Sequence, residues 1–392
     1  MARGGLRGKC VNLQQQIQST MANSDNSGSQ WSRITVKIGS NVLTRPDGTL
    51  NITRMSAIVD QVAQLRRMGV EVTMVSSGAM ACGRGLMRGR CDERQLDAVA
   101  ARQLYSAVGQ AQLMRRYCDF FADHGIACGQ VLTTKASLGT RAHYLNQKRC
   151  MEVMLEHGVI PIVNENDTIS VTELMFTDND ELSGMVAAMM GAQALVILSN
   201  VDGVYDGNPA DPASHVIATI DPRRRLADTS FIQQSKSSFG RGGMATKYGI
   251  ARKVASEGIA VAIANGRRTD IVLHVARGDR SVPYTLFAPS ARPVSSLKKW
   301  IAHSEGFAKG EIHINAGACQ ALLGTGRATS VLPVGVTAVE GDFKRDDIVR
   351  VIGPDGAVVA YGRVACDSAK ARATAGQQGA RPLIHYDYLY ID

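Results

Sequence analysis

The chain has 392 residues, of which 45% are hydrophobic and 20% are charged, a composition typical of globular domains that fold in water. At about 150 residues per domain, this length predicts two or three domains. No run approaches the roughly 20 uninterrupted apolar residues that span a bilayer, so we expect no membrane partner and a cytoplasmic location. The eight cysteines are scattered without a Cys-x-x-Cys pair, which argues against a disulfide framework or a zinc site.

The formal net charge is +9, but it is unevenly distributed. From Lys298 to the end, 11 Lys and Arg stand against 10 Asp and Glu, a net charge of only +1. The excess therefore lies upstream, as expected if the partner is a polyanionic small molecule. The first 31 residues are polar, and Arg3, Arg7 and Lys9 precede the first acidic residue, Asp25. We predict a disordered tail over residues 1–31, with a transit peptide as the alternative.

Strands and helices alternate from residue 33 to residue 264, which predicts an α/β fold with a mostly parallel sheet sandwiched by helices. The expected strands are 33–38, 70–75, 126–132, 159–163, 194–198 and 259–264. The expected helices are 53–68, 96–122, 144–156, one from 182, and 244–256.

The character of the chain changes near residue 289. Residues 288–293 contain two prolines and resemble a linker. Short β segments separated by glycine turns follow, which predicts a small β-rich domain of about 90 residues. The expected segments are 311–314, 331–334, 348–352, 358–364 and 383–386. A Pro-rich junction of this kind predicts few contacts between the two domains.

Three strand-to-helix junctions suit the binding of phosphate or a small ligand. Lys37 lies near the end of the first strand and is followed by Gly39, which places an ammonium and free backbone N–H groups at one edge. The alternative is an ordinary lysine at a strand end, and for Lys37 taken alone that interpretation is the better one. Small residues follow the second strand at 76–79. The Gly-rich stretch 235–243 leads into a helix with Lys247, but the spacing is wrong for a Walker A loop.

Two polar clusters flank a single loop between residues 159 and 184. Asn164-Glu165-Asn166-Asp167 follows a buried strand, and Asp178-Asn179-Asp180-Glu181 precedes a helix. Helix capping explains part of the second cluster, and for Asp178 capping and ligand binding are equally good interpretations. Together the clusters contain more carboxylates and amides than capping requires, which indicates a site for an amino group.

Six segments occur in the order found in the glutamate 5-kinase family, and the chain resembles that family. They are VKIGSNVL at 36–43, VSSGAMACG at 75–83, PIVNEND at 161–167, TDND at 177–180, LSNVDGVY at 198–205 and GRGGMATK at 240–247. The resemblance implies an amino acid kinase fold over residues 32–288. GEIHINAGACQALL and SVLPVGV, between 310 and 336, are similar to a PUA domain, implying a PUA-like domain over 297–392.

The resemblance assigns roles to individual residues. Catalysis falls to Lys37 and Lys247, which bracket the transferred phosphoryl group, and to Asp180, which orients both lysines. The substrate is held by Ser77, Asp167 and Asn179, with Asn164 and Asp178 close by. The nucleotide lies against Lys37, Gly39, Ser199, Asn200, Arg241, Gly242, Gly243, Met244, Ala245, Thr246 and Lys247. Two residues depart from the family: Asn200 replaces a common aspartate, and Arg241 replaces a small residue.

The implied reaction transfers the γ-phosphoryl group of ATP to the γ-carboxylate of L-glutamate, giving glutamyl 5-phosphate for proline biosynthesis, with proline as the expected inhibitor. A γ-carboxylate, with a reference pKa near ~4.3, is already an anionic nucleophile at neutral pH and needs no general base. Lysines, backbone N–H groups and Mg²⁺ bound with ATP would stabilise the transition state. We assign the Mg²⁺ no protein ligand.

Other functions remain as alternatives. In an acetylglutamate kinase, whose substrate has no ammonium, Asp167 would be left unpaired, and an aspartokinase would carry a different regulatory domain. An RNA-binding protein with a vestigial kinase half would not need Lys37, Asp180 and Lys247, and the near-neutral C-terminal domain makes RNA the lesser alternative as a partner. We expect a homo-oligomer, a dimer or tetramer, whose size the sequence does not specify.

Overall fold

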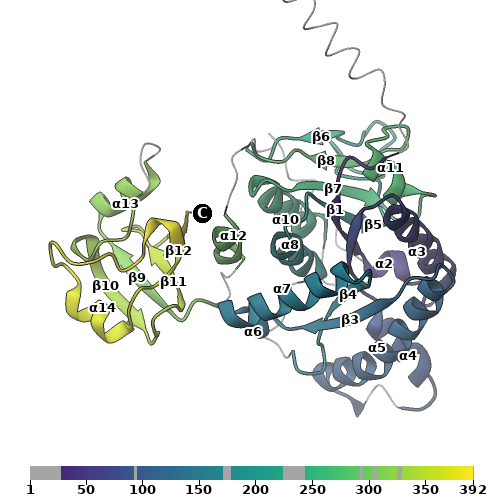
Figure 1. Ribbon diagram of the computed structural model, residues 1–392, viewed down its shortest axis with the longest axis horizontal. Helices are drawn as coiled ribbons and strands as arrows, with labels where there is room; N and C mark the ends of the chain where they lie inside the picture. Colours follow the sequence, from purple (N-terminus) through teal and green to yellow (C-terminus); the bar gives the residue numbers. More distant parts are fainter. Residues whose placement is uncertain are drawn as a thin grey trace, which may run out of the picture.

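The computed structural model describes residues 28–91, 95–170, 178–223, 243–291, 295–303, 307–324 and 329–391. Figure 1 shows two bodies, each built around its own β-sheet, with the short helix α12 between them. The larger body contains the N-terminal two thirds of the chain. The expected fold class, an α/β domain followed by a small β-rich domain, is confirmed.

The larger body has an eight-stranded sheet in the order β3-β4-β2-β1-β5-β7-β8-β6. Its strands are β1 (Arg33–Ile38), β2 (Glu71–Val75), β3 (Cys128–Thr133), β4 (Ile160–Glu165), β5 (Ala194–Ser199), β6 (Thr219–Ile220), β7 (Ala260–Asn265) and β8 (Thr285–Phe287). All neighbouring strands run parallel except β7 and β8. The helices are α2 (Ser40–Leu43), α3 (Ile52–Arg67), α4 (Ala79–Met87), α5 (Ala98–Ala122), α6 (Lys135–Leu138), α7 (Arg141–Glu156), α8 (Asn179–Met190), α10 (Met244–Ser256) and α11 (Ile271–Arg277).

Both faces of this sheet are buried, as expected for parallel strands covered by helices. In β5, Ala194, Val196 and Leu198 belong to one hydrophobic cluster, which includes side chains of α3, α5 and α11. Leu195 and Ile197 point to the other face and pack with side chains of α8 and α10. Strand β5 is therefore apolar at nearly every position because alternate side chains enter different cores.

Helices α4 and α5 cross at very close range, and two glycines permit this. A Cβ atom at Gly109 would lie 1.8 Å from the carbonyl oxygen of Ala79, and one at Gly83 would lie 1.8 Å from that of Tyr105. Neither backbone can accommodate such an approach, so both positions require glycine. The crossing fixes α5 relative to the loop that follows β2.

Strand β4 is longer than the sequence pattern indicates. It continues through Asn164 and Glu165, which pair with Leu132 and Thr133 of β3. The hydrophobic pattern ends at residue 163, but backbone pairing does not depend on side-chain polarity. Both polar side chains are therefore held by the end of the strand rather than by the loop after it.

The smaller body has a five-stranded sheet in the order β10-β9-β11-β12-β13. Its strands are β9 (Gly310–Ile314), β10 (Val336–Gly341), β11 (Ile348–Ile352), β12 (Val358–Arg363) and β13 (Leu389–Ile391), and its helices are α13 (Ala316–Leu323) and α14 (Ser368–Thr374). Neither of these two helices is among the elements expected from the sequence. Each begins at a capping residue, Asn315 or Asp367, whose side chain accepts a backbone N–H of the first turn.

The predictions of two strands in this domain are wrong. Between 331 and 334 there is a single bridge, from Val331 to Ile384, before a 3₁₀ turn over Pro333–Gly335. Proline has no N–H to donate to a ladder, which explains why the strand starts only at Val336. The expected strand 383–386 likewise gives way to a 3₁₀ turn, Tyr386–Tyr388, followed by β13.

Helix α12 (Ser296–Ala302) packs against both bodies, so the expectation of few contacts between domains is wrong. Trp300 is 1% exposed, and its indole N–H donates to the carbonyl of Leu138, 3.2 Å away. The same cluster contains Ile348 and Tyr361 of the C-terminal sheet. The two prolines of the junction therefore do not mark a free linker, because the helix immediately after them packs its apolar side chains against both bodies.

The N-terminal region is described only from residue 28, so the expected tail lies mostly outside the described residues. Its last residues contact the larger body: the Gln30 N–H donates to the carbonyl of Ala276, 2.8 Å away, and Trp31 packs on the core. For these residues the expectation of a disordered tail is wrong. None of the described helices has the length and apolar character needed to cross a membrane.

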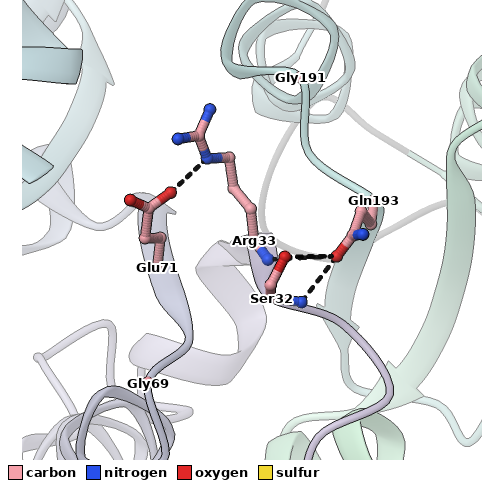
Figure 2. Close-up of a pocket in the computed structure, with 6 residues that line it drawn as sticks. All are labelled: Ser32, Arg33, Gly69, Glu71, Gly191 and Gln193. Carbon is pink, nitrogen blue, oxygen red and sulfur yellow. Dashed lines mark hydrogen bonds and ion pairs between the residues drawn. The ribbon is translucent and has the colours of Figure 1, made fainter.

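A hollow of about 430 Å³ lies at the amino ends of β1 and β2 (Figure 2). Arg33 pairs with Glu71 at 2.5 Å, and the side chain of Gln193 accepts hydrogen bonds from Ser32. Ligands of open α/β sheets bind at the opposite, carboxyl ends of the strands. This hollow is therefore not the candidate active site.

Replacement of Trp300 by alanine in the full chain should destabilise the larger body by about 3–5 kcal/mol, the typical cost of removing a buried aromatic side chain. Lys298→Ala in the same helix, at a half-buried position, is the matched control. Chemical denaturation measures the free energy of unfolding of both variants. Equal stability of the two would show that α12 is not part of the core of the larger body.

Candidate active site

Four neighbouring strands end at one edge of the larger sheet, and each carries a predicted site residue there. In spatial order these strands are β4, β2, β1 and β5. The residues at or just after their carboxyl ends are Asn164, Ser77, Lys37 and Ser199. Because the strands are parallel, all four residues lie along the same edge. The two polar clusters around the 164–180 region meet there as well.

Asp180 holds two lysines at this edge. The Lys37 Nζ lies 2.5 Å from Oδ1 of Asp180, and the Lys247 Nζ lies 2.9 Å from Oδ2. The three residues come from β1 and from the first turns of α8 and α10. The side chains are only 5%, 1% and 11% exposed for Lys37, Asp180 and Lys247, respectively. The structure thus brings together the three residues expected to be catalytic.

The electrostatics of this triad keep Asp180 ionised. Burial by itself would raise the pKa of Asp180, but the Lys37 and Lys247 ammonium groups hold that pKa below its ordinary value. Two positive charges face a single negative one. The three groups alone carry a net charge of about +1 in a poorly hydrated position, and the nearby carboxylate of Asp178 offsets this charge when it is ionised.

Asp178 caps helix α8, which confirms the capping interpretation. Its Oδ1 accepts the backbone N–H groups of Asp180, 2.8 Å away, and of Glu181, 3.1 Å away. Its Oδ2 is buried and has no hydrogen-bond partner within the described part of the chain. Burial and the nearby charge of Asp180 raise the pKa of Asp178 to about 6. An acceptor with an unused lone pair therefore remains beside the lysines.

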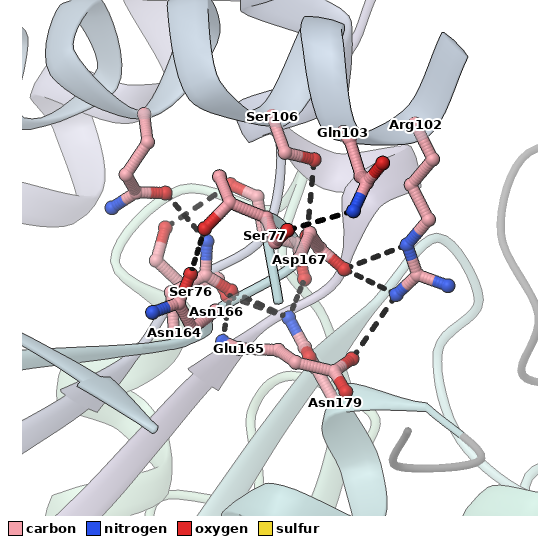
Figure 3. A network of polar contacts seen from close by, with 12 residues as sticks. Ser76, Ser77, Arg102, Gln103, Ser106, Asn164, Glu165, Asn166, Asp167 and Asn179 are labelled. Atoms are coloured by element: carbon pink, nitrogen blue, oxygen red, sulfur yellow. Dashed lines mark hydrogen bonds and ion pairs between the residues drawn. The ribbon is translucent and has the colours of Figure 1, made fainter. Parts of the chain in front are cut away.

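An amide network adjoins the triad, and Figure 3 shows its members converging from four elements. The Asn179 Nδ2 donates to the carbonyl of Ser76 at 2.7 Å, and lies 3.1 Å from both the Ser77 Oγ and the Asn164 Oδ1. Asn164 in turn donates to the side chain of Gln110, 2.9 Å away. These contacts hold the predicted substrate residues Ser77, Asn164 and Asn179 in one rigid group.

Asp167 is paired within the protein. The Arg102 Nε donates to its Oδ1 at 2.8 Å, and Ser106 Oγ donates to its Oδ2 at 3.2 Å. Arg102 also reaches Glu165 at 3.2 Å (Figure 3). The expectation that Asp167 would be unpaired without a substrate ammonium is therefore wrong. Its carboxylate forms one wall of the site together with an arginine.

Sequence reasoning missed Arg102, Ser106 and Gln110, which lie on helix α5. They are spaced by four residues and therefore share one face of the helix. All three are nearly buried despite being polar. A polar stripe at helical spacing inside an otherwise apolar pattern is the signal that could have identified them.

On the other side of the triad, the structure describes most of the expected nucleotide residues. A Cβ atom at Gly39 would lie 2.8 Å from the carbonyl oxygen of Leu198, so β1 and β5 converge too closely for any side chain there. Ser199 is buried at the end of β5, and its Oγ lies 3.4 Å from Oδ1 of the exposed Asn200. Gly243 precedes α10, whose first turn contains Met244, Ala245, Thr246 and Lys247. Arg241 and Gly242 lie outside the described residues.

Comparisons with known proteins agree with this arrangement. The pattern of the amino acid kinase family matches residues 32–265, and that of the PUA domain matches residues 310–385. A protein of Bacteroides thetaiotaomicron named glutamate 5-kinase is 59% identical over 363 residues, which cover 93% of this chain and 99% of that protein. A glutamate 5-kinase of Chlorobaculum tepidum is 46% identical over 365 residues, covering 92% of this chain and 98% of that protein.

The chain therefore belongs to the amino acid kinase family and, within it, to the glutamate 5-kinases, with a PUA domain in its C-terminal part. The resemblance inferred from the sequence motifs is confirmed.

The pKa of Asp178 predicts a pH-dependent stability. The folded-state pKa of about 6 exceeds the ordinary 3.8. The contribution of protonated Asp178 to the free energy of unfolding is therefore fully present below about pH 4, and it is lost as the pH rises through 6. Asp178→Asn keeps a good helix cap but cannot ionise. The stability of the native protein relative to this variant should therefore fall by at most about 3 kcal/mol between pH 4 and pH 7.

Urea denaturation of both proteins across this pH range measures the difference. Asp97→Asn is the matched control, because Asp97 is an exposed cap that accepts the N–H groups of Val99 and Ala100. Parallel pH profiles for native protein and Asp178→Asn would contradict the assignment.

Proposed function

We propose that this protein transfers the γ-phosphoryl group of ATP to the γ-carboxylate of L-glutamate, forming glutamyl 5-phosphate at the start of proline biosynthesis. The observation that carries the proposal is the Lys37–Asp180–Lys247 triad beside the network of amide side chains around Asn179. The names of the two relatives described above support the choice of substrate.

The triad suits phosphoryl transfer between two anions. The reaction needs the carboxylate and the γ-phosphate to be aligned, and it needs the charge on the equatorial oxygens to be stabilised. In this proposal Lys37 and Lys247 provide that charge, and Asp180 keeps both ammonium groups in fixed positions before the substrate arrives. Pre-organised charges in a poorly hydrated site are worth more than the same charges in water.

The donor set fits a metal that arrives with the nucleotide. Both Asp180 oxygens face ammonium groups, and Oδ1 of Asp178 is used as a cap. Within the described residues, the one cluster of three candidate metal ligands is Glu311, His313 and Glu340, on the C-terminal sheet. We therefore propose Mg²⁺ bound mainly by ATP phosphates, with Oδ2 of Asp178 as the available protein oxygen. When bound, the metal would neutralise phosphate charge.

Arg102 and Asp167 suit the α-amino acid end of glutamate. An amino acid zwitterion presents one positive and one negative group close together, and the Arg102–Asp167 pair presents the complementary charges. In this proposal the substrate ammonium contacts Asp167 while its α-carboxylate faces Arg102. Asn179, which directly precedes Asp180, contacts Ser77, and in this proposal both hydrogen-bond the side chain of the substrate.

The rival function is that of an acetylglutamate kinase. The pairing of Asp167 with Arg102 weakens our earlier reason for rejecting it, because Asp167 is satisfied without an ammonium. A coupled assay of ADP release with glutamate, N-acetylglutamate and aspartate separates the candidates. Preference for N-acetylglutamate would overturn the proposed function.

Three further properties belong to the proposal. We propose a homo-oligomer, a dimer or tetramer, located in the cytoplasm. RNA binding by the PUA domain remains the lesser alternative, because the chain from Lys298 onward carries a net charge of only +1.

Removal of either lysine should affect the chemical step. Lys37→Ala and Lys247→Ala should each lower kcat by about 10²-fold or more, as expected for the loss of one electrostatic stabiliser, with little change in the KM for glutamate. Lys148→Ala is the control, because Lys148 pairs with Glu152 on the surface of α7. A variant whose main effect is a raised glutamate KM would place that lysine in the substrate subsite instead.

Asp167→Asn should weaken the binding of both glutamate and the expected inhibitor proline. Both ligands have an α-carboxylate and a cationic nitrogen, and the variant removes the charge that faces the nitrogen. The loss of binding free energy should be about 2–5 kcal/mol, the range typical of breaking a desolvated charge pair. The KM for ATP should change little.

Initial rates against glutamate at several fixed proline concentrations test this expectation. Proline should raise the apparent glutamate KM of the native enzyme. Inhibition that survives unchanged in Asp167→Asn, or that no excess of glutamate relieves, would place proline at a separate site.

A further inference from the structure

Two cysteines outside the active site lie close enough to react with each other. Cys118 is in the last turn of α5, and Cys128 is the first residue of β3. Their sulfur atoms are 3.6 Å apart, within hydrogen-bond distance for thiols. Both cysteines are reduced in this structure. A disulfide requires about 2.05 Å, so the sulfurs need to approach by roughly 1.5 Å.

The fold, rather than chance side-chain placement, brings these thiols together. The turn between α5 and β3 is fixed by the Phe121 carbonyl, which accepts the N–H groups of His124 and Ile126 at 3.0 Å each. Gly125 adopts a φ of 66°, which closes the turn. Phe121 is fully buried and anchors the end of the helix. The two cysteines therefore remain neighbours as long as α5 and β3 are folded.

The two thiols differ in accessibility. Cys118 is exposed to solvent, whereas Cys128 is half-buried at the edge of the core. Burial, followed by the contact with Cys118, raises the pKa of the Cys128 thiol to about 12. An oxidant therefore meets Cys118 first, and Cys128 remains a protonated thiol beside it.

We propose that Cys118 and Cys128 form a reversible redox pair, in which Cys118 is the thiol oxidised by a hydroperoxide and Cys128 is the thiol that resolves it. The Cys118 thiolate attacks the O–O bond; an S–O bond forms, the O–O bond breaks, and the leaving oxygen takes a proton to become water or an alcohol. The Cys128 thiol then gives up its proton as its sulfur attacks the sulfur of the Cys118 sulfenic acid; the S–S bond forms and the S–O bond of the sulfenic acid breaks. The departing hydroxide takes the Cys128 thiol proton and leaves as water.

The balance of the two steps is one hydroperoxide reduced for two thiols oxidised. Oxidation of the exposed Cys118 thus ends at a disulfide, which a thiol reductant can reverse. The disulfide limits further oxidation of Cys118 to sulfinic acid, which is not readily reversed. Because the sulfurs already touch, α5 and β3 need not separate for the bond to form.

The sequence permits a direct test on the full chain. Arg116 and Lys135 are the nearest tryptic sites on either side, so one peptide, 117–135, contains both cysteines. Reduced protein is treated with hydrogen peroxide in slight excess, blocked with N-ethylmaleimide, and digested. If the disulfide forms, this peptide should carry no maleimide and should be lighter by two hydrogen atoms than the reduced peptide. If the oxidised protein is treated with dithiothreitol before the maleimide is added, both thiols should again react with maleimide.

Three variants complete the test. In Cys128→Ser the sulfenic acid of Cys118 should persist and be trapped by dimedone, whereas in Cys118→Ser the remaining Cys128 should stay reduced. Cys150→Ser is the matched control, because Cys150 is also exposed but lies on α7. It should leave formation of the 118–128 bond unchanged. If peptide 117–135 keeps both thiols while Cys150 is oxidised, or if Cys118 forms its disulfide with another cysteine, the proposal is overturned.

Discussion

The contact of Asp180 with two lysines is the constraint on which the active-site edge depends. Lys37 is fixed by the centre of the sheet, Asp180 by the first turn of α8, and Lys247 by the first turn of α10. Because both ammonium groups lie within about 3 Å of the same carboxylate, they would repel each other if that carboxylate were absent. One buried charge therefore sets how three separate elements meet at this edge of the sheet.

Helix α5 imposes the second constraint. Its close crossing with α4, which requires Gly83 and Gly109, brings Arg102 over Asp167 and Gln110 over Asn164. The amide network thus depends on a packing contact between two helices that carry no predicted catalytic residue. A side chain at either glycine would displace α5, and with it the partners of Asp167 and Asn164, without contacting the triad.

The α/β fold and the position of polar residues at one edge of the sheet follow from local sequence patterns, whereas the catalytic roles of these residues are expectations from the resemblance to the glutamate 5-kinase family. Lys37 follows from an apolar strand that ends in glycine, and the acidic cluster at 178–180 follows from its place before a helix. The pairing of Asp167 with Arg102 could not be predicted, because it joins residues 65 positions apart. The extension of β4 through Glu165 was missed for a related reason, since hydrophobic patterning does not report backbone pairing.

Helix α12 packs against the two helices that carry Asp180 and Lys247. Its C-cap residue, His303, is paired with Glu257 at 3.1 Å, and both side chains are almost fully buried. Glu257 ends the helix that carries Lys247 in its first turn. On α8, one turn beyond Asp180, a Cβ atom at Gly184 would lie 2.9 Å from Val254 of α10 and 3.5 Å from His303. The two helices that supply Asp180 and Lys247 therefore share a tight contact with α12. A displacement of the C-terminal domain that moved α12 would act on both helices together, because neither has free space beside this glycine.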